Sequence, residues 1–420
     1  MSLSKNVLLI CLRFPPSPGI GGRRWAKFAK ELATRGYRIH VIAALETNEE
    51  SSLWTEDVQH PNIHIYDVPN LYPELKPSSS LWQKVKNRWV LQQLLWDTQG
   101  TPFDKGIYWK KGMLRKAKEL IDQHNISRVI ATGAPFSILY HSVELKEQFP
   151  HIQLIVDYRD PWLHAVNYGM QDLSPKRKAF EHAQEQKVLR KADLIIAPTH
   201  PNLLIGREAI EEAEAQTKAL EIPHSFDPQD LLDISVSARE EADTIKMIFG
   251  GALYIGVDKQ LVKLRDWTRE IRMNDPELYQ RLEIDIYSKD YARGRSLLDP
   301  NDQVIRFHEP IPKKELFQAL VKADIALLFL AEHNKDYKTT KFFEILALRC
   351  PFLLLGPEGK VSQYIEEKGI GTYLPSHVED VSRFMEIIYE LKEEKARFQT
   401  MDINDFSLAK VTDQLIYHFS

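Results

Sequence analysis

Cysteine and net charge are both scarce in this chain. Its 420 residues include two cysteines, Cys11 and Cys350, which excludes a disulfide scaffold and a cysteine-built metal site and favours a reducing compartment. The 55 lysines and arginines nearly balance the 59 aspartates and glutamates, which leaves a net charge of −4. A chain of this size that is so close to neutral is not expected to bind nucleic acid.

Long hydrophobic runs are also absent. No stretch of about eighteen apolar residues occurs, so no transmembrane helix is predicted. The first apolar run, residues 7–12, is too short for the core of a signal peptide, and no small-residue cleavage site follows it. These absences predict a soluble, cytoplasmic protein, which could still rest on the inner face of a membrane as a peripheral protein.

Short apolar runs instead alternate with amphipathic helical patterns along almost the whole chain. Continuous Val/Ile/Leu runs between helices are typical of parallel sheets that are covered on both faces, so the expected fold class is α/β. The expected strands are 7–12, 39–45, 129–132, 152–157 and 194–198 in the first half, and 245–249, 282–287, 304–307, 325–330 and 352–355 in the second.

The length of the chain and one punctuated segment predict two domains. Chains of this length usually form two domains, and residues 221–229 carry two prolines within an Asx/Ser cluster. We therefore expect a first doubly wound domain over 1–222 and a second over 223–400, with a cleft between them.

The segment 81–118 departs from the pattern of the rest of the chain. It holds nine lysines and arginines but only two acids, and it contains four of the eight tryptophans. Cations interleaved with interfacial aromatic residues on helices are typical of a surface that rests on an anionic membrane. The alternative is a partly buried surface helix whose lysine stems cover apolar atoms.

Three loops carry candidate binding residues. Gly21 and Gly22 lie where the first strand leads into a helix, so backbone N–H groups can approach an anion there. The pattern is not the G-x-G-x-x-G fingerprint, which argues against a nicotinamide cofactor. The segment 157–162 (Asp-Tyr-Arg-Asp-Pro-Trp) stands at the carboxyl end of an expected strand, where α/β sheets bind ligands, although an Arg–Asp structural clamp is the alternative.

The third loop leads into a helix near residue 340. Thr339 or Thr340 can cap that helix, and Lys341 and Glu344 share one face of it. Asp336 lies in the loop before it. A lysine at a helix N-terminus can neutralise phosphate and carboxylates can accept hydrogen bonds from hydroxyls, so this group suits a nucleotide-sugar. The alternative is a capped surface helix with a local ion pair.

Taken in order, these segments resemble retaining glycosyltransferases of family 4, which have the GT-B fold. The resemblance spans nearly the whole chain and rests on five loose motifs in the family's order. They are Phe14-Pro15-Pro16 with Gly21-Gly22 and Leu32-Ala33-Thr34-Arg35-Gly36, Thr132-Gly133-Ala134-Pro135-Phe136-Ser137, Asp157-Tyr158-Arg159-Asp160-Pro161-Trp162, Pro223-His224-Ser225-Phe226-Asp227, and Thr340-Lys341-Phe342-Phe343-Glu344 with Pro351.

The resemblance implies two Rossmann-like domains with parallel sheets that face each other across a cleft. It also implies that a C-terminal helix within 401–420 returns to the first domain. The first domain would bind the acceptor and the second the nucleotide-sugar donor. Such enzymes transfer a sugar to a glycan or lipid-linked glycan, with retention and without a metal ion or another cofactor, and here the expected role is cell-surface polysaccharide synthesis.

The resemblance also assigns residues. Asp336 and Glu344 match the family's two acids with seven residues between them, the first contacting the donor sugar and the second the ribose. The donor diphosphate would meet Lys259, Lys341, Thr339, Thr340, Gly21 and Gly22. Asp160 and Arg159 would act on the acceptor side, with His164 as a further candidate. Lys259 and Lys341 would stabilise the leaving group. His308 and Pro310 would lie at the nucleobase.

The chain also departs from the family pattern. The family's diphosphate-binding arginine is missing after the first strand of the second domain, where Ala252 or Val257 stands. Arg23, Arg293 or Arg295 could replace it. This departure and the aspartate at 336 favour an alternative function, a catalytically idle GT-B protein that serves as a binding or scaffold subunit. A sugar-nucleotide epimerase is a third interpretation, against which the Asp-x-Arg-Asp-Pro-Trp turn argues.

Overall fold

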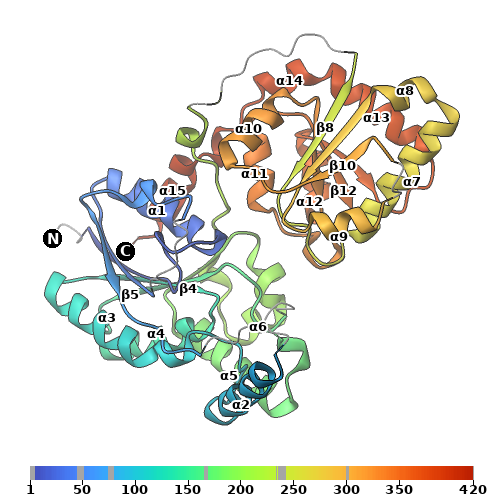
Figure 1. Ribbon diagram of the computed structural model, residues 1–420. Helices are drawn as coiled ribbons and strands as arrows, with labels where there is room; N and C mark the ends of the chain where they lie inside the picture. Colours follow the sequence, from blue (N-terminus) through green and yellow to red (C-terminus); the bar gives the residue numbers. More distant parts are fainter. Residues whose placement is uncertain are drawn as a thin grey trace. The chain divides into compact units, whose positions relative to one another are not determined.

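The computed structural model describes residues 5–44, 52–73, 80–164, 169–232, 234, 243–298 and 302–419. The last residue of the expected strand 39–45 lies outside these ranges. The chain divides into two compact units, Met1–Pro223 with Leu408–Ser420 (unit 1) and His224–Ser407 (unit 2). Figure 1 colours them from blue to green, with a red terminal helix, and from yellow to red. Each unit is a complete layered α/β structure.

Unit 1 is built on a seven-stranded parallel sheet with the strand order β3-β2-β1-β4-β5-β6-β7. In its centre β1 lies between β2 and β4, so that Leu9 has Val41 on one side and Ile130 on the other. The strands are β1 (Asn6–Ile10), β2 (Arg38–Ala43), β3 (Ile63–Asp67), β4 (Arg128–Gly133), β5 (Gln153–Tyr158), β6 (Leu194–Ala197) and β7 (Ala219–Glu221).

The helices of unit 1 are α1 (Arg23–Thr34), α2 (Leu81–Asp97), α3 (Lys110–His124), α4 (Ser137–Gln148), α5 (Pro175–Lys191), α6 (Arg207–Glu212) and α15 (Leu408–Tyr417). Most of them cover this sheet, whereas α2 lies beside α5, away from the strands (Figure 1). Although α15 follows all of unit 2 in the sequence, its residues Leu408, Val411 and Leu415 are buried in the core of unit 1 together with α1. This apolar face makes the C-terminal helix part of unit 1.

Unit 2 repeats the design with a six-stranded parallel sheet in the order β10-β9-β8-β11-β12-β13. Its strands are β8 (Ile245–Gly250), β9 (Leu282–Tyr287), β10 (Ile305–His308), β11 (Ile325–Phe329), β12 (Phe352–Gly356) and β13 (Thr372–Pro375). Its helices are α7 (Asp258–Asn274), α8 (Pro276–Arg281), α9 (Tyr291–Ser296), α10 (Lys313–Lys322), α11 (Thr340–Ala347), α12 (Lys360–Lys368), α13 (Val381–Glu393) and α14 (Lys395–Thr400).

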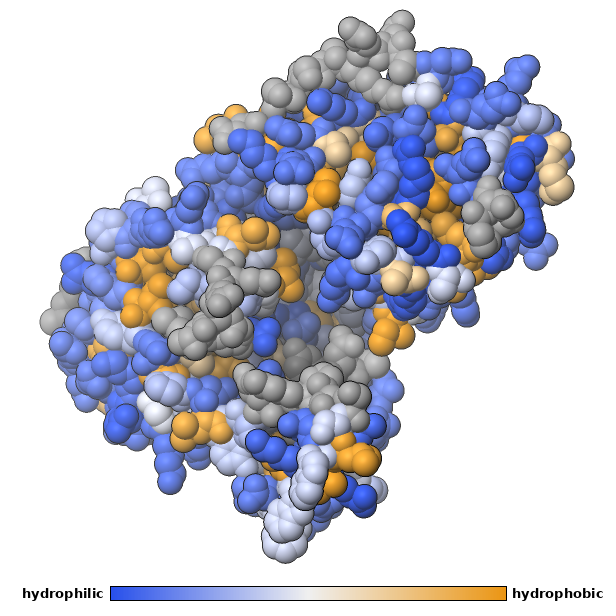
Figure 2. Space-filling model, in the orientation of Figure 1, coloured by the Kyte–Doolittle hydropathy of each residue, from blue (hydrophilic) through white to orange (hydrophobic). Residues whose placement is uncertain are grey.

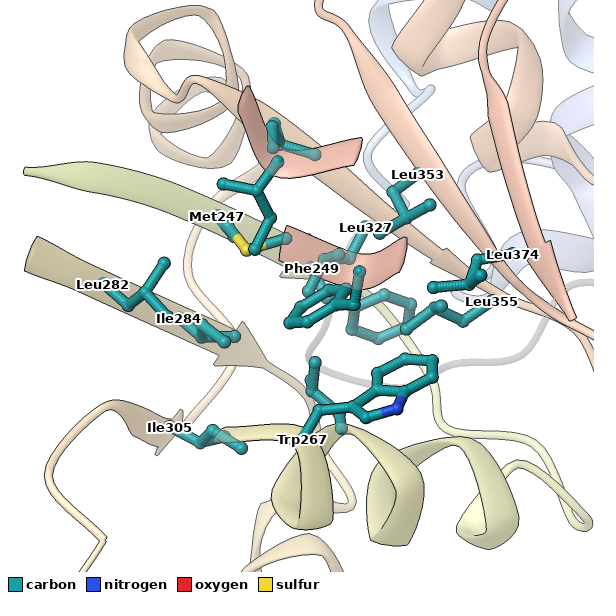
Figure 3. Packing of buried hydrophobic residues seen from close by; sticks show 14 of the residues in the cluster. Met247, Phe249, Trp267, Leu282, Ile284, Ile305, Leu327, Leu353, Leu355 and Leu374 are labelled. Atoms are coloured by element: carbon teal, nitrogen blue, oxygen red, sulfur yellow. The ribbon is translucent and has the colours of Figure 1, made fainter. Parts of the chain in front are cut away.

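The core of unit 2 explains why its strands are so apolar. Met247, Phe249 and Leu327 project from β8 and β11 toward Trp267 of α7 (Figure 3), and Trp267 stacks on Phe384 of α13 with 4.8 Å between the ring centroids. A second apolar cluster that includes α11 covers the other face. Successive side chains of a strand point to opposite faces of the sheet. Because both faces are covered, all of these side chains must be apolar, which gives continuous apolar runs in the sequence.

The strand order places a topological switch point in each sheet. The chain moves outward from β1 to β3 and then restarts at β4 in unit 1, and from β8 to β10 before it restarts at β11 in unit 2. Ligands of open α/β sheets bind at the carboxyl ends of the two strands that flank such a point. The loops after β1 and β4, and after β8 and β11, are therefore the places to examine.

The parallel α/β architecture that the sequence predicts is confirmed. The structure adds β3, β7 and β13, which the hydrophobic pattern does not predict. All three stand at sheet edges and are partly exposed, so their sequences are less apolar. Among the described residues, no helix combines the length and the apolar character that crossing a membrane requires.

Candidate functional site

Lys341 occupies the switch point of unit 2. It lies in the first turn of α11, and its Nζ donates a hydrogen bond to the Ala252 carbonyl, 3.1 Å away in the loop after β8. The ammonium also lies 4.4 Å from the centroid of the Phe249 ring. Gly251 makes this approach feasible, because its φ is +137° and a Cβ there would overlap the Lys341 side chain. The two loops therefore meet around one cation.

The surroundings of Lys341 leave its charge weakly solvated. Burial lowers the pKa of Lys341 to about 8, although Glu344 and Asp290 act to raise it. A cation in such a place gains more from a bound anion than an exposed lysine does, since water screens it less. This site therefore suits the phosphates of a ligand.

The N-terminus of α11 adds to the positive potential. The sequence predicts that Thr339 or Thr340 caps this helix, and in the structure Thr339 is the N-cap residue and Thr340 the first helical residue. The Thr339 side chain does not cap the helix, and its buried Oγ1 has no hydrogen-bond partner among the residues that the structure describes. The positive end of the helix dipole and the Lys341 ammonium thus occur together, which is a favourable environment for an anion.

Glu344 and Asp336 have different surroundings in the structure. Glu344 is paired with Lys313, 3.3 Å away, and Lys313 is also paired with Asp230 at 3.0 Å. Asp336 accepts a hydrogen bond from the backbone N–H of Lys360, 2.7 Å away at the start of α12. Glu344 thus lies one turn after Lys341 on α11 with its carboxylate paired to Lys313, whereas the Asp336 carboxylate bonds to the first backbone N–H of α12.

The loop between β8 and α7 is held in shape by side chains of unit 2. Asp290 accepts from the Leu253 N–H at 3.1 Å, and Arg293 donates to the Leu253 carbonyl at 2.6 Å. Lys259 is exposed in the first turn of α7. Arg295 donates to the Phe307 carbonyl at 2.8 Å. Arg293 and Arg295, two of the three arginines suggested as replacements for the missing family arginine, thus bond to backbone carbonyls in this structure.

The expected nucleobase region follows β10. His308 ends that strand, and its Nε2 lies 2.7 Å from Oδ1 of Asp285, while its ring stacks on Tyr287 with a centroid distance of 4.7 Å. Pro310 is exposed two residues later. This stacked pair presents a flat aromatic surface at the carboxyl edge of the sheet, which is compatible with a base.

Arg159 occupies the switch point of unit 1. Its Nε and Nη2 donate to the carbonyls of Gly133 and Ala134, at 3.1 and 2.7 Å, and Nη1 donates to the carbonyl of Gly21. Gly21 ends the loop after β1, and Gly22, which is buried, directly precedes α1. Arg159 therefore clamps the loops after β1 and β4 together.

Asp160 and Asp157 differ in their surroundings. Burial raises the pKa of Asp160, although Arg159 acts to lower it, so this carboxyl group retains a proton more readily than usual. Asp157 is fully buried and accepts from Trp25 Nε1 at 2.7 Å, Thr132 Oγ1 at 3.0 Å and Arg24 Nε at 3.3 Å. Asp157 is thus a structural residue, and Asp160 keeps a carboxyl group beside the clamp.

Two long-range contacts of these sites are not evident from the sequence. Arg24 also donates to the carbonyls of Ile222 and Pro223, at 2.8 and 3.0 Å, and so connects α1 to the end of the first segment of unit 1, almost 200 residues later. Lys313 is likewise far from Glu344 in the sequence. The sequence shows charged residues close to apolar strands, but it does not show which distant residues they contact.

Comparison at the level of sequence gives no relative, since no family model and no curated protein matches the chain. Comparison of structures gives clear similarity over the whole chain. A glycosyltransferase from Rickettsia africae is 11% identical with a TM-score of 0.63, covering 99% of this chain and 97% of that one. A trehalose-6-phosphate structure from E. coli, bound with UDP-2-fluoro glucose, is 12% identical with a TM-score of 0.62, covering 98% of each chain.

A third similar structure carries the name of a different kind of enzyme. A putative UDP-N-acetylglucosamine 2-epimerase from Listeria monocytogenes is 10% identical with a TM-score of 0.53, covering 98% of this chain and 95% of that one. At such identities the similarity establishes the architecture and leaves the activity to the site residues. The predicted fold class is thereby confirmed: the chain has the GT-B fold, with two Rossmann-like domains.

Proposed function

We propose that this protein is a glycosyltransferase that moves a sugar from a nucleotide-sugar to a glycan acceptor. The observation that carries the proposal is the Lys341 ammonium, which lies at the switch point of unit 2 between the glycine loop after β8 and the N-terminus of α11. Glu344, one turn further along α11, offers a carboxylate to ribose hydroxyls. The GT-B fold and the nucleotide-sugar in a structure of the same architecture agree with this assignment.

The chemistry assigned to Lys341 is stabilisation of the leaving group. In the transfer, the bond between the anomeric carbon and the diphosphate oxygen breaks, and a bond from an acceptor hydroxyl oxygen to that carbon forms. The diphosphate gains negative charge as it leaves and can take the hydroxyl proton. A preorganised cation with helix N–H groups lowers the energy of this developing charge. We assign Lys259 and Thr340 to the same anion and His308 to the base.

The finer parts of the proposal follow from the resemblance to family 4. They are retention at the anomeric carbon, a reaction without a metal ion, and a role in cell-surface polysaccharide synthesis. Asp160 is the proposed acceptor-side group, since it is a partly buried carboxyl with a raised pKa at the switch point of unit 1. Arg159 is proposed to position the loops beside it.

A thermal-shift screen with UDP, GDP, ADP and CMP and their common sugars tests the donor site. We expect one nucleotide family to raise the melting temperature, because a ligand that binds the folded state stabilises it. The variants Lys341→Met and Glu344→Ala should lose this shift. Lys335→Met is the matched control, since this lysine is paired with Glu332 on the neighbouring loop and should leave the shift intact. Equal shifts in all four proteins would contradict the site.

A binding protein without catalytic activity is the second candidate function. Two observations favour it, namely the engagement of Asp336 with the backbone of α12 and the absence of an arginine from the loop after β8. Incubation with the nucleotide-sugar that gives the shift distinguishes the two. Release of the nucleoside diphosphate, alone or with an acceptor, supports the transferase, whereas binding without any release supports the binding protein.

We further propose that α2 rests on an anionic membrane and that the acceptor is lipid-linked. Trp82, Trp89 and Trp96 recur every seven residues and are 85%, 71% and 88% exposed, while Leu94 is buried on another side of the helix. Lys84, Lys86 and Arg88 are exposed on the same helix. The surface over α2, at the bottom of Figure 2, mixes hydrophobic and strongly hydrophilic residues. Exposed tryptophans with cations match the interface of an anionic bilayer.

Sedimentation with vesicles of phosphatidylcholine and phosphatidylglycerol tests the surface. Changing Trp82, Trp89 and Trp96 to serine, or Lys84, Lys86 and Arg88 to glutamine, should reduce binding at least tenfold. The control changes three exposed lysines of unit 2, Lys314, Lys322 and Lys368, to glutamine and alters net charge equally. If the control and the α2 variants lose binding equally, α2 has no special role.

A further inference from the structure

Three histidines of unit 1 come together from three different elements. His40 belongs to β2, His64 belongs to the edge strand β3, and His124 is the last residue of α3. His40 and His64 are direct partners in the strand register. The His40 ring stacks on the His124 ring with 4.2 Å between the centroids and on the His64 ring with 5.4 Å. This histidine stack therefore joins the edge strand, the neighbouring strand and a covering helix.

His40 is the buried member of the histidine stack. Its side chain is only 1% exposed, and its Nδ1 lies 3.2 Å from the hydroxyl oxygen of Tyr66, two residues after His64 on β3. Its Nε2 is buried and has no hydrogen-bond partner among the described residues. A doubly protonated imidazole carries an N–H at both nitrogens. In the closed stack, the N–H at Nε2 of such a ring would have no acceptor.

The titratable and charged groups that face His40 add to this penalty. They are Arg38 of β2, His64 and Tyr66 of β3, and His124 and Lys116 of α3. β1 places Leu8, which carries no charge, beside His40. None of these groups is a carboxylate, and the Lys116 ammonium already bonds to Glu119 at 2.7 Å. A positive charge on His40 would therefore meet further cations and no compensating anion from this set.

Protonation of His40 is consequently unfavourable while the stack is closed. Burial, followed by His124, His64 and Arg38, lowers the pKa of His40 to about 4 from the usual 6.5. A lowered histidine pKa means that the closed stack binds this proton more weakly than an opened, solvated ring does. Each pH unit from 6.5 down to 4 therefore raises the open population about tenfold. Above pH 6.5 the ring is neutral in both states, and the closed stack has its full stability.

β3 is the member of this assembly that can open by itself. It is an edge strand with one neighbour, and only its first residue, Ile63, is buried. Segments with few buried contacts open at a lower cost in free energy than the core does. We propose that the histidine stack is a pH-sensitive latch, which holds β3 against β2 and the end of α3 at neutral pH and lets β3 open locally in acid.

The latch stands at the base of the segment that carries α2. In the sequence α2 lies between β3 and α3, so opening of β3 loosens one of the two chain segments that lead into this helix. Acid should thus change how α2 is presented to a membrane. This consequence rests on the proposed function of α2, whereas the latch itself does not.

Hydrogen exchange of the full chain at pH 7.5, 6.5 and 5.5, corrected for the intrinsic exchange rate at each pH, tests the latch without vesicles. Protection of residues 63–67 in β3 should fall about tenfold between pH 6.5 and 5.5. Residues 245–250 of β8, in the core of unit 2, should keep their protection. His40→Phe retains an aromatic ring but cannot titrate, so β3 should show a flat profile in this variant.

Two further variants complete the experiment. His40→Gln also removes the titrating group and should flatten the β3 profile, so the test stands even where a phenylalanine ring does not fit. His182→Asn is the matched control, because His182 is an exposed histidine of α5, and its β3 profile should follow that of the unaltered protein. Unchanged protection of β3 down to pH 5.5, an equal loss in β8, or a loss as steep in both His40 variants as in the unaltered protein would each overturn the proposal.

Discussion

At the scale of single residues, Lys341 makes donor binding dependent on pH. The pKa of its ammonium is about 8 in the unliganded protein because burial lowers it, and a bound diphosphate would raise it. Binding then takes up a proton when the pH exceeds 8. We expect the affinity for the nucleoside diphosphate to be nearly constant below pH 7 and to fall up to about tenfold per pH unit above 8.

Calorimetric titration at pH 6.5, 8 and 9.5 measures this effect. Lys341→Met should bind more weakly at every pH and show a flat profile over this range, because the group that titrates has been removed. A profile in the variant as steep as in the unaltered protein would assign the pH dependence to another group.

Glu185 of α5 should make the stability of unit 1 depend on pH. Both of its carboxylate oxygens are buried, and neither has a hydrogen-bond partner in the described part of the chain. Burial, followed by the charge of Glu181, raises the pKa of Glu185 to about 8 from the usual 4.5. A raised pKa means that the folded state holds the proton more tightly than the unfolded chain. The stability contribution is therefore complete below pH 4.5 and is lost as the pH rises through 8.

Thermal unfolding of Glu185→Gln between pH 5 and 8.5 tests this assignment. The variant should lose less stability across this range and should melt at least ~3 °C higher at pH 8.5. Glu147→Gln is the control, because Glu147 is exposed and paired with Lys187. If Glu185→Gln follows the unaltered protein as closely as Glu147→Gln does, the pKa of Glu185 does not differ between the folded and unfolded states and the assignment is wrong.

At the scale of elements, α15 stabilises unit 1 from the far end of the chain. Leu415 is fully buried in the core of unit 1, and Asp413 forms an ion pair with Arg35, which follows α1. Leu415→Ala should destabilise the protein by ~2–5 kcal/mol, because a cavity replaces a packed side chain. Denaturant unfolding followed by circular dichroism measures the change. Gln414→Ala, at an exposed neighbouring position, should leave stability within ~0.5 kcal/mol.

The edge strands show where sequence patterns lose their information. β7 is three residues long and partly exposed throughout, and β3 has one buried residue at its start. An edge strand has one neighbour and contacts less of the core, so few of its positions must be apolar. The central strands, by contrast, were recognisable because both of their faces are covered.

At the scale of the whole molecule, a bound nucleotide should slow hydrogen exchange in the donor-site loops of unit 2 and leave most of the chain unchanged. Hydrogen exchange with and without the nucleotide that gives the thermal shift should show slower exchange in residues 250–257 and 337–343 of unit 2. The physical reason is that a bound ligand suppresses local opening of the loops it contacts. Protection confined to segments outside these two loops would place the nucleotide elsewhere.

Much of the candidate donor site could be read from the sequence, but its detailed partners could not. The helix start at Thr339 and Thr340 and the proximity of Lys341 and Glu344 follow from local periodicity. The pairing of Glu344 with Lys313, and of Asp336 with the start of α12, depends on how distant segments pack. The same is true of Arg159, whose carbonyl contacts come from two other loops.

The sequence by itself determined that this is an α/β protein with parallel sheets, since burying both faces of a strand demands an uninterrupted apolar run. It also determined where the polar loops lie. Only the tertiary structure decided which loops meet: it brought Lys341 to the Gly251 loop, ninety residues earlier. Such contacts depend on strand order and packing, which local side-chain patterns do not encode.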